Sequence, residues 1–218
     1  MNELIKEING MLKNQSFEYA FCGGYAIDLF LEKQTRPHGD VDIMTYWKDR
    51  DAVIVYMQSL GYTVYEMIGD GKAHLISDIS KQFKTKRNIA CIKDNSTKAV
   101  LSKTEKQDIF YIDFPDIPQY KSDFVEFLFN DKNDTDFLYA RNHEIRRVLD
   151  KAILFSDDIP YLSPELCLLY KSTDTERNGY QHDYDAAMAK MNDEQKAWLN
   201  KALALVYDGN HKWISDTI

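Results

Sequence analysis

Hydrophobic and polar positions follow two different periods over the first 155 residues. Apolar residues recur at helical spacing over 3–14, 25–32 and 50–60, which predicts a helix with one buried face in each stretch. Short runs rich in aromatic and β-branched residues, bounded by glycine or polar turns, predict strands. These runs cover residues 17–22, 41–45, 62–65, 74–76, 89–92, 109–114, 124–129 and 137–141. The polar stretch 93–107 is expected to be a loop.

The pattern becomes almost wholly helical after about residue 155. Ser163-Pro164-Glu165 is typical of a helix start, because serine caps, proline fits the first turn and glutamate favours the helix dipole. Residues 182–191 and 193–207 are predicted to form two further helices. We therefore predict an α+β domain over residues 1–155 and a helical domain over residues 156–218.

Composition and charge narrow the class of protein. Hydrophobic residues make up 44% of the 218 positions, as in an ordinary folded soluble protein, and the formal charge is −8. Proteins that grip extended nucleic acid are usually basic, so this partner is disfavoured. We see no signal peptide and no apolar run long enough for a membrane span. The three cysteines are far apart and form no CxxC motif, which favours a cytoplasmic location.

Two short motifs carry the candidate chemistry. Gly23 and Gly24 end a predicted strand and open a helix, where a phosphate can approach backbone N–H groups. Asp40 and Asp42 follow in a predicted strand, and residues i and i+2 of a strand point the same way. Two such close carboxylates repel each other unless a cation joins them, and Mg²⁺ prefers oxygen ligands together with phosphates. Either motif alone is common, but the two in this order predict a Mg²⁺-triphosphate site.

The segment 21–43 resembles the GGxAxD…TRxHxDxD signature of the small-molecule nucleotidyltransferases that adenylylate aminoglycosides and lincosamides. The matching residues are Gly23, Gly24, Ala26, Asp28, Thr35, Arg36, His38, Asp40 and Asp42. The stretch 161–185 is similar to the family's helical PExxxxxK…KDxxD tail, although His182 stands where the family has lysine. This resemblance implies a polymerase-β-like core, a mixed sheet flanked by helices, with a C-terminal helical subdomain.

The resemblance also implies an activity. A hydroxyl of a small molecule, such as an aminoglycoside- or lincosamide-like antibiotic, attacks the α-phosphorus of an NTP, with ATP as the default, and pyrophosphate leaves. Asp40 and Asp42 would hold Mg²⁺, while Gly23 and Gly24 would receive the β- and γ-phosphates.

The family uses a third carboxylate on a neighbouring strand, to share the metal or to take the acceptor's proton. Glu126 is the best candidate, because a charged residue inside an apolar strand needs a partner. The alternative for Glu126 is an outward position on an edge strand. Asp123, at the start of the same strand, is the second candidate and a weaker candidate for acceptor binding. His38 is expected to orient its turn rather than to transfer protons.

Three further residues have two interpretations each. Arg36 either binds the triphosphate or forms a salt bridge with Asp28 or Glu32. Lys171 either binds phosphate or is a solvated helix lysine. Asp183 either contacts the acceptor or caps its helix, and the cap is favoured.

Two other functions stay open at this point. The first is a nucleotidyltransferase toxin that modifies tRNA or a protein, which the acidic charge disfavours. The second is a catalytically inactive nucleotide-binding domain, which would be favoured if no further carboxylate lay near Asp40 and Asp42. The sequence contains no GxxxxGK[ST], HExxH or GxSxG motif, so P-loop, zinc-protease and serine-hydrolase chemistry are disfavoured.

Overall fold

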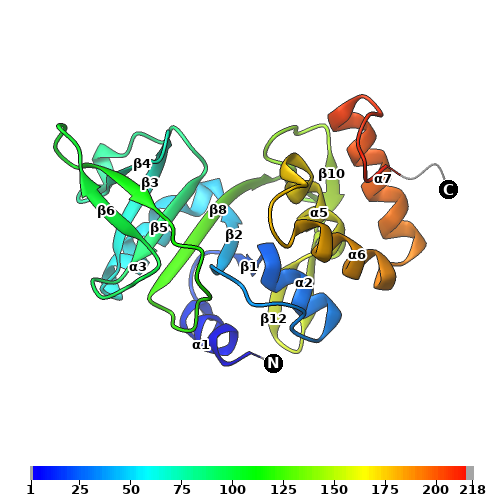
Figure 1. The fold of residues 1–218 in the computed structure, drawn as a ribbon, viewed down its shortest axis with the longest axis horizontal. Helices are drawn as coiled ribbons and strands as arrows, with labels where there is room; N and C mark the ends of the chain where they lie inside the picture. The colour runs from blue at the N-terminus through cyan, green and yellow to red at the C-terminus, as the bar shows by residue number, and fades with distance from the viewer. Residues whose placement is uncertain (1, 215–218) are drawn as a thin grey trace. The chain divides into compact units, whose positions relative to one another are not determined.

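The computed structural model describes residues 2–214, which form two compact units (Figure 1). The N-terminal unit comprises Asn2–Tyr19 and Pro37–Asp131, and the C-terminal unit comprises Ala20–Arg36 and the chain from Lys132 onward. Residues 132–155 thus share a unit with the C-terminal helices, and the predicted division after residue 155 stays a prediction. Within the described residues, no helix is both long and apolar enough to span a membrane.

A mixed sheet forms the centre of the N-terminal unit. Its strands lie in the order β2 (Asp42–Tyr46), β8 (Phe124–Lys132), β5 (Asn88–Ile92), β3 (Thr63–Gly69), β4 (Lys72–Leu75), β7 (Ile109–Asp113) and β6 (Val100–Lys103). Strands β2 and β8 run parallel, and each following pair is antiparallel. The predicted loop over 93–107 was wrong at β6, which pairs with β7 but has exposed side chains at most of its positions. Its sequence therefore lacks the apolar alternation that identifies a half-buried strand.

Two helices accompany this sheet. Helix α1 (Glu3–Leu12) begins at Asn2, whose side chain accepts a hydrogen bond of 2.9 Å from the backbone N–H of Leu4. Helix α3 (Arg50–Ser59) stops just before Gly61, which has a φ of +78°, as the sequence predicts. Short 3₁₀ helices occupy Trp47–Asp49 and Ile79–Lys81 in this unit, and Ser172–Asp174 in the C-terminal unit.

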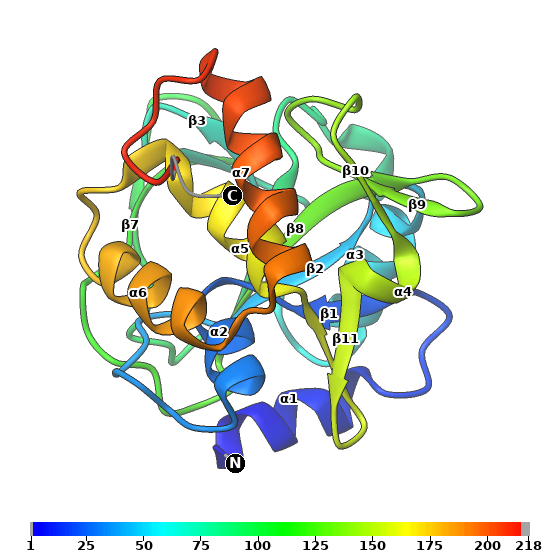
Figure 2. The same ribbon diagram turned by 90° about the vertical axis from the view of Figure 1, so that its right-hand side faces the viewer.

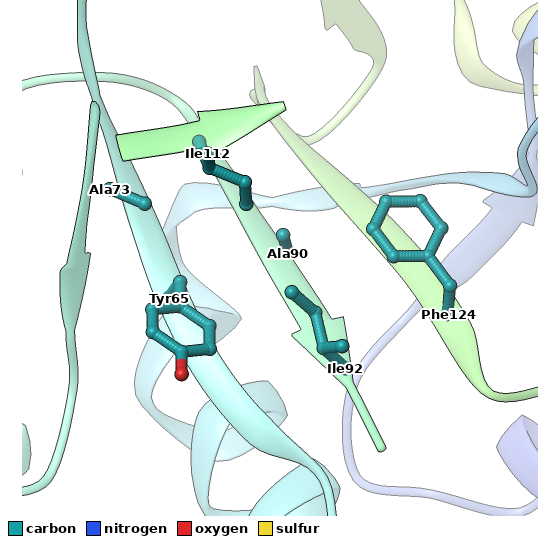
Figure 3. Packing of buried hydrophobic residues seen from close by; sticks show 6 residues of the cluster. All are labelled: Tyr65, Ala73, Ala90, Ile92, Ile112 and Phe124. Atoms are coloured by element: carbon teal, nitrogen blue, oxygen red, sulfur yellow. The ribbon is translucent and has the colours of Figure 1, made fainter. Parts of the chain in front are cut away.

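A hydrophobic cluster in the N-terminal unit fixes the strands that carry the site. Figure 3 shows the cluster's buried side chains gathered over neighbouring strands. They are Tyr65, Ala73, Ala90, Ile92, Ile112 and Phe124. Burying each of the larger side chains contributes roughly 1.5–3 kcal/mol. Because this cluster includes residues of β5 and β8, it holds the backbone on which Glu126 is mounted.

The C-terminal unit contains strands as well as helices. Strand β12 (Ile159–Leu162) pairs antiparallel with β11 (Ile153–Ser156), and Phe21 of β1 (Tyr19–Phe21) pairs with it in parallel. The expectation of an almost wholly helical chain after residue 155 was therefore wrong. The four residues of β12 are all buried, and so short an apolar run shows no period from which a strand can be identified. A small hairpin, β9 (Asp136–Leu138) with β10 (Arg146–Val148), precedes the short helix α4 (Leu149–Ala152).

Four helices complete the C-terminal unit (Figure 2). They are α2 (Gly23–Leu31), α5 (Pro164–Lys171), α6 (Tyr180–Lys190) and α7 (Asp193–Tyr207). Helix α2 contacts α5 and α6, and α5 also contacts α7. Helix α5 begins with proline after Ser163, as predicted, but the Ser163 side chain makes no capping hydrogen bond.

Candidate active site

Three carboxylates converge at the start of strand β2. Asp40, Asp42 and Glu126 each offer one oxygen, and these oxygens lie within 4.8 Å of one another. Among residues 2–214 this is the one group of three or more acidic, histidine or cysteine side chains close enough to hold a metal ion. All three residues are partly exposed, so the group is accessible from solvent. The sequence predicted that Asp40 lies within a strand. In the structure Asp40 lies in the turn before β2, which begins at Asp42.

The parallel pairing of β2 with β8 brings Glu126 to this group. Asp42 and Glu126 are register partners, and the backbone N–H of Glu126 donates a hydrogen bond of 3.1 Å to the carbonyl oxygen of Val41. Since β8 lies between β2 and β5, the alternative of an edge-strand position for Glu126 was wrong. Asn88 of β5 donates a 2.6 Å hydrogen bond to the Oε1 atom of Glu126, which orients this carboxylate.

Asp123 is not part of this group. It stands just before β8, and its carbonyl oxygen accepts a 2.9 Å hydrogen bond from the backbone N–H of Lys93. The geometry therefore favours Glu126 over Asp123 as the third carboxylate.

The negative charge of the carboxylate group affects the pKa of the buried Cys91 thiol. Burial raises the pKa of Cys91, and the Glu126 carboxylate raises it further. A cation placed among the three carboxylates would be attracted by the same field.

A second cluster of charges lies in the C-terminal unit, around Asp183. The guanidinium of Arg36 grips this carboxylate with two hydrogen bonds, Nε to Oδ1 at 2.8 Å and Nη2 to Oδ2 at 2.7 Å. The Nζ atom of Lys171 lies 3.0 Å from Oδ2, and it also lies 4.1 Å from the centre of the Tyr180 ring. Burial raises the pKa of Asp183, but the bonds from Arg36 and Lys171 outweigh it and lower the pKa overall.

The geometry corrects the alternative interpretations of these residues. Arg36 pairs with Asp183, a partner that the sequence did not suggest. The Oδ1 atom of Asp28 accepts two hydrogen bonds from Thr35, both 3.0 Å. Lys171 is only 5% exposed, so it is not a solvated helix lysine. Asp183 does not cap its helix, because α6 already begins at Tyr180.

Gly23 and Gly24 form the first turn of helix α2, which starts two residues earlier than predicted. The φ of Gly23 is +64°, a conformation that residues with a side chain rarely adopt. Glycine is therefore required at the position where the strand turns into the helix.

Comparison with known families supports the class that the sequence motifs suggest. Residues 4–107 match the family described as Aminoglycoside-2''-adenylyltransferase. The chain is therefore similar to the small-molecule nucleotidyltransferases over this part of its length. It is thus an enzyme of the nucleotidyltransferase type, as the motif in residues 21–43 had indicated. No curated protein matches the sequence.

Solved structures of this class share the fold. The solution structure of the antibiotic-resistance factor ANT(2'')-Ia matches with a TM-score of 0.53 and 12% identity, covering 94% of this chain and 92% of that one. ANT(2'')-Ia in complex with adenylyl-2''-tobramycin gives a TM-score of 0.52 and 13% identity, covering 94% and 97%. The lincomycin-bound lincosamide antibiotic adenylyltransferase LnuA gives a TM-score of 0.53 and 16% identity, covering 88% and 98%. The polymerase-β-like fold class with C-terminal helices is thereby confirmed.

Three residues of this nucleotidyltransferase were missed in the sequence. Asn88 and Lys98 approach the carboxylate group from segments that carry no motif. Gly179 lies against Arg36, because a Cβ atom there would stand 2.7 Å from Arg36 Nε. Only the three-dimensional contacts reveal these roles, because no local sequence pattern marks any of the three residues.

Proposed function

We propose that this nucleotidyltransferase transfers AMP from ATP to a hydroxyl group of a small molecule and releases pyrophosphate. The observation that carries the proposal is the convergence of Asp40, Asp42 and Glu126 in a chain of this family. A catalytically inactive domain has no need to hold three carboxylates together against their mutual repulsion.

The donor set fits Mg²⁺. Three carboxylate oxygens within 4.8 Å of one another offer the hard ligands that this ion prefers, and their partial exposure leaves room for water and phosphate oxygens. When bound, Mg²⁺ would supply neutralisation of the triphosphate's negative charge. Asp40, Asp42 and Glu126 would hold it.

The transfer itself breaks one bond and forms one. The acceptor's hydroxyl oxygen attacks the α-phosphorus, and the bond from this phosphorus to the pyrophosphate oxygen breaks. The hydroxyl proton must leave during the attack, and Glu126 is the carboxylate that we assign either to accept it or to share the cation. Asn88 keeps the Glu126 side chain oriented for either task, through its 2.6 Å hydrogen bond.

The remaining candidates bind the phosphates or the acceptor. We assign the backbone N–H groups of Gly23 and Gly24, together with Arg36 and Lys171, to the phosphates of the nucleotide. The Asp183 side chain has no exposed surface, so its part is to position Arg36 and Lys171 rather than to contact the acceptor.

We infer the acceptor class from the ligands of the similar solved structures. LnuA was crystallised with lincomycin, and ANT(2'')-Ia with adenylyl-2''-tobramycin, so hydroxylated antibiotics are the first acceptors to test. Asp123, just before β8, stays our candidate for an acceptor contact. We expect the acceptor to be a small molecule rather than an extended nucleic acid, because the formal charge of the chain is −8.

The experiment incubates the purified protein with Mg²⁺, each labelled NTP and a panel of aminoglycosides, lincosamides and cellular metabolites. We expect pyrophosphate release that needs ATP and one class of acceptor. A parallel incubation with tRNA and with total cell protein tests the macromolecular alternative. Label transferred only to tRNA or protein would replace the small-molecule assignment, and no release with any acceptor would favour an inactive domain.

A further inference from the structure

Lys98 is a buried cation in the N-terminal unit that the proposed chemistry does not use. Lys98 is only 5% exposed. The Nζ atom donates hydrogen bonds to the carbonyl oxygens of Ile117, at 2.5 Å, and of Pro115, at 3.2 Å. Desolvation makes a buried lysine costly unless its charge and its hydrogen bonds are satisfied. The carbonyl groups of Pro115 and Ile117, which lie in an irregular segment, satisfy two of the hydrogen bonds that the buried ammonium needs.

The same ammonium group lies against the turn that leads into the carboxylate group. A Cβ atom at Gly39 would stand 3.8 Å from Lys98 Nζ and 3.7 Å from the carbonyl oxygen of Ile117. Two residues along, the backbone N–H of Gln119 donates a 2.9 Å hydrogen bond to the carbonyl oxygen of His38. Segment 115–119 is therefore hydrogen-bonded to the turn at His38–Gly39. Asp40 is the residue that directly follows this turn.

We propose that Lys98 is a positioning residue, whose hydrogen bonds to segment 115–119 hold the turn before β2 and so keep Asp40 aimed at the metal site. The proposal rests on the proposed function, since it assumes that Asp40, Asp42 and Glu126 bind a divalent cation. Metal ligands need support from neighbouring groups to keep their geometry, and losing one such contact typically weakens binding by roughly 10–100-fold.

Charge and position act in opposite directions at Lys98, which makes the proposal testable. A positive charge near a metal site repels the metal, so its removal alone would strengthen metal binding. The carboxylates of Asp40, Asp116 and Asp123 all act on the Lys98 ammonium and oppose the lowering of its pKa by burial. Carboxylates beside an ammonium offset part of its electrostatic effect on a nearby metal ion. We therefore expect the loss of position to outweigh the loss of charge.

The test measures Mn²⁺ binding directly, from the electron paramagnetic resonance signal of free Mn²⁺, in the full-length protein without nucleotide. We expect Lys98→Met to weaken Mn²⁺ binding about tenfold or more, and Lys98→Arg to restore part of it. Lys103→Met, at an exposed lysine of β6, is the matched control and should bind within about twofold of wild type. Equal or tighter Mn²⁺ binding by Lys98→Met would overturn the proposal.

Two further variants separate the possible failures. Asp42→Asn reports whether the carboxylate group binds metal at all, because wild-type binding that Asp42→Asn leaves unchanged would contradict the proposed function itself. Binding that is lost in Asp42→Asn but kept in Lys98→Met would overturn only the role of Lys98. Lys98→Gln replaces the ammonium with an uncharged amide on a shorter side chain. If Lys98→Met does not fold, Lys98→Gln takes its place, and weaker Mn²⁺ binding than in the wild type is expected for it as well.

Discussion

Asp42 and Glu126 are register partners on β2 and β8, the adjacent strands of the N-terminal unit that run parallel. Parallel strands place equivalent ends side by side, so two residues that are 84 positions apart in the sequence present their carboxylates together. Two negative charges held this close destabilise the folded protein unless a cation binds. This pairing is therefore a functional arrangement that stability alone does not favour.

Glu126→Gln tests the third carboxylate. The substitution keeps the size of the side chain and removes one negative charge, so we expect the melting temperature to stay equal or rise. Transferase turnover should fall about 10²–10³-fold, the loss typical for a catalytic acid or base, or for a metal ligand. Steady-state kinetics over a range of Mg²⁺ concentrations measures it.

Glu105→Gln, at an exposed position in the connection between β6 and β7, is the matched control and should keep full turnover. Loss of turnover that excess Mg²⁺ restores would assign Glu126 to metal binding. Loss that Mg²⁺ does not restore would assign it to proton transfer. Unchanged turnover would remove Glu126 from the site.

Asp183→Asn tests the buried charge cluster of the C-terminal unit. The carboxylate accepts bonds from both Arg36 and Lys171, and its removal leaves two cations without their shared negative partner. Removing one partner of a buried ion pair costs about 3–5 kcal/mol in the free energy of unfolding. Urea denaturation followed by circular dichroism measures this change.

Asp185→Asn is the control for this substitution, because Asp185 lies on the same helix but is exposed. We expect its effect to stay below about 0.5 kcal/mol. An equally small effect of Asp183→Asn would show that the cluster contributes nothing to stability.

The stability of the C-terminal unit should depend on pH in the acid range. The hydrogen bond from Arg147 lowers the pKa of Glu194 to about 2, and the pKa of Asp183 is lowered as well. A carboxyl group whose pKa is lower in the folded state stabilises the protein above its unfolded pKa, roughly 4, and this contribution is lost as the pH falls through the folded pKa. The free energy of unfolding should therefore decline between about pH 5 and pH 2.

Urea denaturation at several pH values checks this dependence. Glu194→Gln removes one of the two carboxyl groups, so its profile should be flatter than that of the wild type. A wild-type profile that does not fall below pH 5 would contradict the assigned pKa shifts.

The sequence predicted those parts of the fold whose signal is local. The helices α1 and α3 and the buried strands β2 and β8 follow from apolar periodicity, and the charged Glu126 within an apolar strand marks itself as unusual. Each of these predictions depends only on residues close together in the chain.

The features that were missed depend on long-range contacts. Strand β6 is mostly exposed, so only its pairing with β7 makes it a strand. Lys98 lies in a polar stretch in which a lysine is normally solvated, and Arg36 finds Asp183 at a distance of 147 residues. No local pattern encodes these partners, because they become neighbours only when the chain has folded.

The most direct test of the proposed transfer is whether an acceptor gains an adenylyl group. The protein is incubated with ATP, Mg²⁺ and the acceptor that supports pyrophosphate release, and the acceptor is then weighed by mass spectrometry. We predict that one adenylyl group is added per pyrophosphate released, and that Asp42→Asn lowers the rate about 10³-fold, or ~4 kcal/mol, while its melting temperature is unchanged or higher. ATP hydrolysis without any change in acceptor mass, or full transfer by Asp42→Asn, would contradict the proposed transfer.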